Sequence, residues 1–248
     1  MRDRTLLWDG CLNVRDLGGH PTDDGRETRW GRVVRADSVR QLSDDGWASL
    51  ADYGVRTIVD LRLQSELDAD PPAELPVDVV HIPLMPELGT PFWGEIDELT
   101  LSIDDPVAER REVYLTFFER RPHEFAEAVR AVAAAPGGAV LVHCQGGKDR
   151  TGLVVALLLR LARVPIAEIA HDYAISEERL ADDSAAWIAQ AETDRDRTLR
   201  TRIVAAPAEA MQLVLEELER RHGSVAAYLR RGGTATADLD RVRSRLVD

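Results

Sequence analysis

The apolar positions of this chain form two patterns, short β-branched runs and longer runs with helical spacing. Short runs bounded by glycine, proline or polar residues predict buried strands. They occupy residues 33–35, 55–61, 77–82 and 139–143. Between and after them, apolar residues three and four positions apart predict helices. These helices cover residues 43–53, 107–120, 122–135, 149–163, 176–191, 207–222 and 237–247, and a further helix begins at Pro165.

This order of elements predicts the fold class. Strands interspersed with helices indicate an α/β architecture, in which a central, mostly parallel sheet is flanked by helices. The length and the lack of repeats or low-complexity stretches predict one domain over residues 1–248. Residues 86–105 contain two prolines and are interpreted as a mobile loop. We expect residues 86–121 to form a lid segment and residues 176–230 to form a helical insertion.

The charge balance limits the partners of the protein. A formal net charge of -13 at pH 7 argues against binding of nucleic acid or of an anionic membrane through bulk electrostatics. An anionic substrate must therefore be attracted by a local arrangement of donors. The longest purely apolar run, residues 153–159, is shorter than the roughly 20 residues that span a bilayer, so no stable membrane insertion is expected.

The cysteines and histidines predict the compartment and the cofactor content. The chain has two cysteines, Cys11 and Cys144. Disulfide-stabilised domains are usually small and rich in cysteine, so free thiols in a reducing compartment are expected. The N-terminal residues lack the apolar stretch of a signal peptide. This favours a cytoplasmic protein, with secretion by another route as the alternative. The histidines lack the spacing of metal ligands, and we expect neither a metal nor another cofactor.

One segment carries candidate chemistry. Cys144 follows an apolar strand, Arg150 follows it at Cys-x5-Arg spacing, and Thr151 leads into an apolar helix. A cysteine near a cation and a helix N-terminus has a lowered pKa and can be a thiolate at neutral pH. The spacing puts a sulfur and a guanidinium at opposite ends of an anion-sized loop. This arrangement suits nucleophilic attack on a phosphate monoester.

The residues around this cysteine predict how the anion is held. Gly146 and Gly147 permit backbone dihedrals that let successive N–H groups converge on an anion, and Arg150 can clamp two oxygens. Thr151 can donate a hydrogen bond to the cysteine sulfur, and His143 is expected to orient the loop. The predicted phosphate-binding loop residues are Gln145, Gly146, Gly147 and Lys148.

The sequence also resembles a known family. Residues 143–152 read His-Cys-Gln-Gly-Gly-Lys-Asp-Arg-Thr-Gly and resemble the signature loop of the Cys-dependent protein tyrosine and dual-specificity phosphatases. They are most similar to an atypical bacterial branch that also acts on phosphoinositides, and residues 13–19, 59–62 and 172–176 resemble other motifs of that branch. The resemblance implies hydrolysis through a phosphocysteine. Val14 stands where an aromatic residue is usual, and Gly146 where alanine is usual.

The sequence leaves open which residue is the general acid, because no Trp-Pro-Asp motif is present. Asp149 is the first candidate, since it lies in the loop and the resemblance favours it. The alternative role of Asp149 is to begin the helix. Asp60 ends a strand and is the second candidate, although it can equally hold Arg15 or Arg62. Asp97, in the expected lid, is the third.

Two basic residues bear on the substrate. Lys148 beside Arg150 would suit a substrate with several phosphates, such as an inositol headgroup; its alternatives are solvation or pairing with Asp149. Arg15 is a further candidate cation, and Arg15 and Asp60 are placed among the substrate-binding residues. The expected partners are a phosphorylated protein or a phosphoinositide, with inorganic phosphate as the product.

Two other functions use the same loop. A module that binds phosphorylated ligands without turnover would keep the loop but lose catalysis. An arsenate- or sulfur-handling enzyme would need a second, resolving thiol, and Cys11 is the candidate for it.

Overall fold

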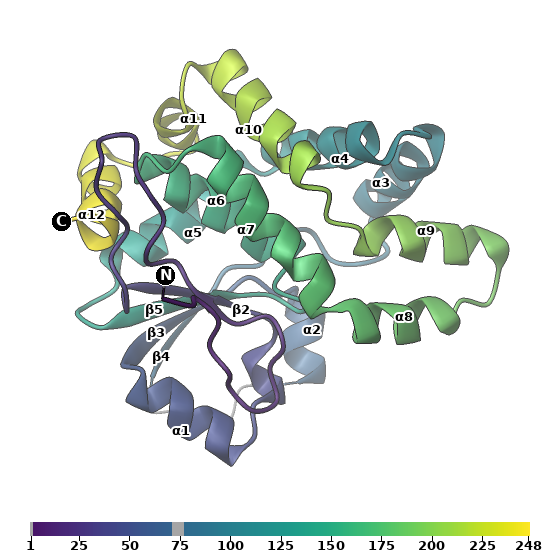
Figure 1. Ribbon diagram of the computed structural model, residues 1–248. Coiled ribbons are helices and arrows are strands. Elements are labelled where there is room, and N and C mark those ends of the chain that lie inside the picture. The colour runs from purple at the N-terminus through teal and green to yellow at the C-terminus, as the bar shows by residue number, and fades with distance from the viewer. Residues whose placement is uncertain (1, 71–76) are drawn as a thin grey trace.

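A five-stranded sheet forms the centre of the protein, whose computed structural model describes residues 2–70 and 77–248 (Figure 1). Its strands are β1 (Arg15–Asp16), β2 (Val33–Ala36), β3 (Val55–Asp60), β4 (Asp78–His81) and β5 (Ala139–His143). Their order is β1-β2-β5-β3-β4. Neighbouring strands are parallel, except that β1 runs antiparallel to β2. The predicted α/β architecture with a mostly parallel sheet is confirmed.

Strand β5 lies between β2 and β3, and its two faces are buried against different helices. Val140 and Val142 contribute to the larger hydrophobic core, whereas Leu141 contributes to a second core on the opposite face. Successive strand residues point to opposite faces, so a continuous apolar run fits a strand that is covered on both sides. Helix α1 (Asp44–Asp52) covers the smaller core, and α5 (Pro122–Ala134) and α6 (Asp149–Leu161) cover the larger one (Figure 1).

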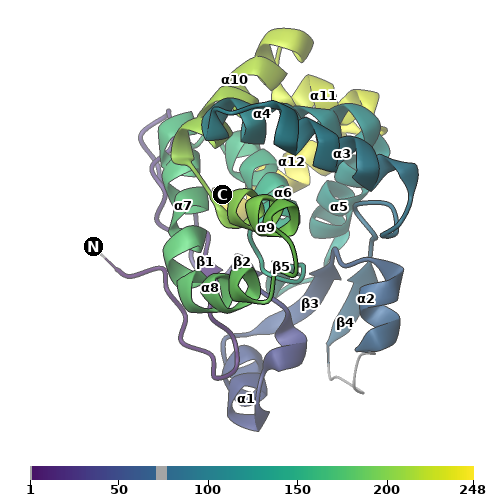
Figure 2. The ribbon, with the colours of Figure 1, turned by 90° about the vertical axis from the view of Figure 1, so that its right-hand side faces the viewer.

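Helix α6 is the centre of the helical layer. Its residues are buried on nearly all sides, because it contacts α5, α7, α11 and α12. The remaining helices are α2 (Gln64–Ala69), α3 (Pro91–Ser102), α4 (Pro106–Arg120), α7 (Ile166–Arg179), α8 (Ala181–Ala189), α9 (Asp194–Val204), α10 (Ala208–His222), α11 (Val225–Arg231) and α12 (Thr236–Leu246), and a 3-10 turn covers Val39–Gln41. Helices α8 and α9 project from the body of the molecule and face the viewer in Figure 2.

Several predicted elements differ from the structure. The expected mobile loop at residues 86–105 contains α3, whose Phe92 and Trp93 stack against Phe117 of α4. Proline is well tolerated in the first turn of a helix, so Pro91 begins α3 instead of preventing it. The predicted helix at residues 176–191 is two helices, because α7 continues to Arg179 and α8 begins at Ala181. Helices α2, α9 and α11 and strand β1 were not predicted.

Candidate active site

The candidate nucleophile lies in the connection between β5 and α6. Residues 144–148 form this connection and are called the Cys144 loop. The loop follows the carboxyl end of a parallel strand and precedes the N-terminus of a helix. In α/β folds this position commonly binds ligands, and the helix dipole favours an anion there.

The carbonyl oxygens of the loop are held away from its centre by other segments. Ser38 N–H donates to Gln145 O at 2.8 Å, Asn13 Nδ2 donates to Gly146 O at 3.0 Å, and Arg35 Nη2 donates to Gly147 O at 2.7 Å. Within the described chain, the backbone N–H groups of residues 145–148 donate to no protein acceptor. These N–H groups are therefore available to an anion, as the two loop glycines predicted.

The two loop glycines are not equivalent. Gly147 has a φ of 65°, and a Cβ built on it would lie 2.4 Å from Ala36 O. A side chain at this position would therefore both clash with β2 and strain the backbone. Gly146 lacks the positive φ, and a Cβ on it would meet only Leu180 Cδ1, at 3.7 Å. The alanine that is usual at position 146 in the similar phosphatases would fit here.

The cysteine sulfur has the neighbours that the sequence predicts. Cys144 is buried, and Thr151 Oγ1 donates a hydrogen bond to its Sγ at 3.2 Å. His143 Nδ1 contacts the Cys144 carbonyl oxygen at 3.1 Å. Burial lowers the pKa of His143, Asp60 raises it, and the net direction is downward. The structure places Thr151 and His143 beside Cys144, and their roles stay predictions.

The guanidinium of Arg150 is oriented by Glu66, a residue that the sequence did not single out. Arg150 Nη2 lies 2.9 Å from Glu66 Oε1, and Nη1 lies 2.5 Å from Oε2. Glu66 also accepts a hydrogen bond from Leu63 N–H at 2.6 Å, which fixes the carboxylate at the start of α2. The pair occupies the terminal edge of the guanidinium and leaves the Nε edge for phosphoryl oxygens. The only sequence signal was a carboxylate shortly after the predicted strand end at Arg62.

Charge attraction keeps Arg150 protonated and Glu66 ionised. Burial lowers the pKa of Arg150, but the nearby Cys144 and Glu66 raise it above its ordinary value. Burial raises the pKa of Glu66, but Arg150 lowers it below its ordinary value. Arg150 therefore interacts electrostatically with both Cys144 and Glu66.

Asp60 lies beside His143, the residue that precedes the Cys144 loop, and is paired with Arg62. Its carboxylate accepts from Arg62 Nη2 at 2.8 Å and lies 3.6 Å from His143 Nε2. Burial raises the pKa of Asp60, but His143 and Arg62 lower it below its ordinary value. This position matches the alternative role, holding Arg62. The expectation that Asp60 binds substrate or donates a proton is corrected, because the carboxylate is buried and already paired.

Arg15 lies behind the loop. Its Nε donates to Asp172 Oδ1 at 3.1 Å, and its other donors reach Ser176 and Asn13. Arg35 Nη1 donates to the other oxygen of Asp172 at 2.6 Å. The expectation that Arg15 binds substrate is therefore corrected: Arg15 is buried, and its donors are engaged by the protein.

Lys148 points toward α9. Its Nζ donates to the carbonyl oxygens of Ile203 and Ala205 and lies 3.4 Å from Asp149 Oδ1. Burial lowers the pKa of Lys148. The predicted pairing of Lys148 with Asp149 is present, whereas the expected contact with a second phosphate has no free donor in this arrangement.

Asp149 is surrounded by donors. It accepts from the Tyr114 hydroxyl, and Arg110 Nη1 lies 3.8 Å from its Oδ1. Burial raises the pKa of Asp149, but Lys148, Arg110 and Tyr114 together lower it below its ordinary value. This environment favours the ionised carboxylate, so Asp149 carries no proton to donate in this arrangement.

A cavity of about 200 Å³ opens beside the loop and is called the loop-side cavity. Asp149 and Arg150 line it together with Asp97 of the expected lid. Its apolar lining residues are Leu63, Met85, Leu88, Trp93, Ile96, Val113, Phe117 and Ile203. Asp149 and Arg150 therefore face a largely apolar chamber with room for a ring.

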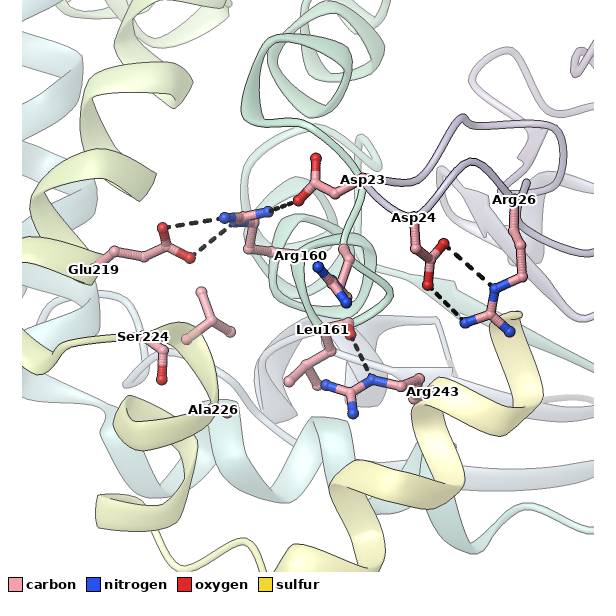
Figure 3. A pocket seen from close by; sticks show the side chains of 11 residues that line it. Asp23, Asp24, Arg26, Arg160, Leu161, Glu219, Ser224, Ala226 and Arg243 are labelled. Carbon is pink, nitrogen blue, oxygen red and sulfur yellow. Dashed lines mark hydrogen bonds and ion pairs between the residues drawn. The ribbon is translucent and has the colours of Figure 1, made fainter. Parts of the chain in front are cut away.

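A larger hollow of about 570 Å³ lies at the opposite end of α6 (Figure 3). Arg160 there is paired with Asp23 and Glu219, and Arg26 is paired with Asp24. Its lining contains no cysteine. The hollow therefore lacks the thiol and the loop N–H groups of the Cys144 loop, and size alone does not identify the active site.

Cys11 does not suit the role of a resolving thiol. Its Sγ donates to Ser38 O at 3.5 Å, and burial, assisted by Asp37, raises the pKa of the thiol well above its ordinary value. A thiol with a raised pKa is a poor nucleophile at neutral pH.

A thiol in an anion-binding loop, with a fixed guanidinium beside it, defines a Cys-dependent phosphatase. The model of the tyrosine phosphatase family matches residues 6–248. A tyrosine-protein phosphatase of Nostoc commune is 30% identical over 86% of this chain and 73% of its own. The triple specificity protein phosphatase PtpB of Mycobacterium tuberculosis is 27% identical over 96% of this chain and 97% of its own. The chain belongs to the tyrosine phosphatase family, and it is a phosphomonoester hydrolase.

Substituting the two loop glycines separately tests the geometry of the loop. Gly147→Ala should lower kcat/KM for p-nitrophenyl phosphate by about 100-fold, because the loop must shift and its N–H groups no longer converge. Gly146→Ala should change it by no more than about threefold, since a methyl group fits there. Steady-state rates of the two variants, with melting temperatures as a folding control, measure this. Equal losses in both variants would contradict the distinction.

The Arg150–Glu66 pair predicts a positioning effect on catalysis. Glu66→Gln should lower kcat by about 10- to 100-fold with little change in KM, because the guanidinium loses its charged support. Glu87→Gln is the matched control. Glu87 accepts from Gln64 N–H at 2.7 Å at the same end of α2, but it forms no contact with Arg150. If both variants lose activity equally, the role of Glu66 is to stabilise α2 alone.

Proposed function

We propose that this phosphatase acts through a phosphocysteine on Cys144. The observation that supports the proposal most is that Cys144, loop N–H groups without a protein acceptor and Arg150 lie together where β5 connects to α6. In the first step the thiolate attacks phosphorus, the S–P bond forms and the ester P–O bond breaks. The loop N–H groups and Arg150 stabilise the charge of the transition state, where preorganised donors have their largest effect.

In the second step, water attacks the phosphocysteine and releases inorganic phosphate. The S–P bond breaks, and the Thr151 hydroxyl stabilises the departing thiolate through the hydrogen bond that it makes with Sγ. Asp149, which its surroundings keep ionised, accepts the proton of the attacking water. Lys148 and Arg110 support this role by holding the carboxylate beside the loop.

We propose phosphotyrosine-containing proteins as the first substrate class. The relatives are named as a tyrosine-protein phosphatase and a triple specificity protein phosphatase. The largely apolar loop-side cavity supports an aromatic ring next to the phosphate. Phosphoinositides are the second class, and they would require Lys148 to leave the carbonyl oxygens of Ile203 and Ala205.

The proposal places the enzyme in a reducing, cytoplasmic environment, where Cys144 remains a thiol. Both cysteines are free in the structure. Within the described residues, no helix is both long and apolar enough to cross a membrane.

Rates of phosphate release test the mechanism and the substrate class together. Substrates are p-nitrophenyl phosphate, phosphotyrosine and phosphoserine peptides and a phosphoinositide panel, each with and without a chelator. Cys144→Ser should lower every rate by at least about 1,000-fold, because the nucleophile is lost. Cys11→Ser should retain activity. Phosphotyrosine peptides should be hydrolysed fastest.

Other outcomes point to the competing functions. Binding of phosphopeptides without turnover by the wild type would indicate a binding module. Loss of activity in Cys11→Ser would instead indicate an enzyme with a resolving thiol.

A further inference from the structure

Three carboxylates line the loop-side cavity, and their surroundings differ. They are Glu66 on α2, Asp97 on α3 and Asp149 at the start of α6. A group that protonates the leaving oxygen must carry a proton and must not be tied to a cation. The partners of each carboxylate therefore decide which of the three can act as the acid.

Two of the three carboxylates are fully engaged. Glu66 binds Arg150 through both oxygens and accepts from Leu63 N–H. Asp149 accepts from the Tyr114 hydroxyl and faces Lys148 and Arg110. Cations within ion-pair distance favour the ionised form of a carboxylate. Neither group is therefore suited to deliver a proton at neutral pH.

Asp97 is the carboxylate without such a partner. In the described part of the chain it makes no hydrogen bond and no ion pair, and Arg195 of α9, the cation that lowers its pKa, is paired with Glu98 at 2.8 Å. Burial raises the pKa of Asp97, Arg195 lowers it, Glu98 raises it, and the net direction is upward. Across the cavity the charged groups are Glu66, Arg110, Asp149 and Arg150.

Helix α3 turns Asp97 toward the cavity. Trp93, Ile96 and Thr100 line the same cavity, and these positions share one face of a helix with residue 97. Glu98, one position further, does not line the cavity and pairs with Arg195 instead. Partial burial on this apolar wall favours the protonated form of Asp97, whereas the cations beside Glu66 and Asp149 favour their ionised forms.

We propose that Asp97 is the proton donor to the leaving group and that Asp149 acts only in the second step. This inference rests on the proposed function of the Cys144 loop. As the S–P bond forms and the ester P–O bond breaks, the Asp97 O–H bond breaks and the leaving oxygen takes the proton. Asp149 later takes a proton from water as the phosphocysteine is hydrolysed. Asp97 then regains a proton from solvent, and Asp149 releases its proton to solvent.

The dependence of kcat/KM on the leaving group tests the donor. The substrates run from p-nitrophenyl phosphate, whose leaving group needs no proton, to phenyl phosphate, whose leaving group does. Asp97→Asn should lower kcat/KM for phenyl phosphate by about 100-fold or more and for p-nitrophenyl phosphate by less than about fivefold. Because the acid must be protonated, the wild-type rate on phenyl phosphate should fall as pH rises through its pKa. This decrease in rate with rising pH should be absent in Asp97→Asn.

Glu95→Gln is the matched control, since Glu95 lies on α3 outside the cavity and pairs with Arg120, and its kcat/KM should match the wild type. Asp149→Asn should accumulate phosphoenzyme in rapid-quench experiments without steepening the leaving-group dependence. Equal behaviour of Asp97→Asn and Glu95→Gln, or a steeper dependence in Asp149→Asn alone, would overturn the assignment. Failure of the proposed function is distinguishable, because the wild type would then hydrolyse none of the substrates.

Discussion

The buried carboxylate of Asp172 binds two buried arginines, and the shape of the anion-binding loop depends on this triad. Arg35 extends from Asp172 to the carbonyl of Gly147, and Arg15 extends through the Asn13 side chain to the carbonyl of Gly146. Each link turns a loop carbonyl away from the anion space and leaves the N–H groups facing it. Removing one partner of a buried ion pair costs about 3–5 kcal/mol, because an uncompensated charge stays buried, so the loop depends on all members of the triad.

The same triad places a net positive charge behind the loop. Two guanidiniums face one carboxylate there, in a region that water does not reach. An acidic protein can therefore bind a dianionic phosphate through a local field, because buried charges are screened much less than those on the surface. Arg150 adds its charge on the open side of the loop, and Glu66 holds it in one orientation without occupying its Nε edge.

The other two cations near the loop, Lys148 and Arg110, interact with Asp149 and with α9. Lys148 and Arg110 both face Asp149, and both donate to carbonyl oxygens in or just after the last turn of α9. The end of a helix exposes unpaired carbonyl oxygens, which basic side chains satisfy. The Lys148 and Arg110 side chains therefore connect the end of the Cys144 loop to α9. The loop-side cavity lies among these groups, with α3 closing its apolar wall.

The sequence by itself determined the features that local patterns encode. Strand periodicity, the Cys-x5-Arg spacing and the loop glycines predicted a nucleophile between β5 and α6, the Thr151–Cys144 contact and the mostly parallel sheet. The tertiary structure decided which charges meet, since Arg15 and Asp172 are 157 positions apart and Glu66 and Arg150 are 84 apart. A local sequence pattern does not predict contacts between residues that are so far apart in the chain. For the same reason, only the fold could show that Arg15, Asp60 and Lys148 are bound by the protein and that Asp97 faces the cavity from a helix.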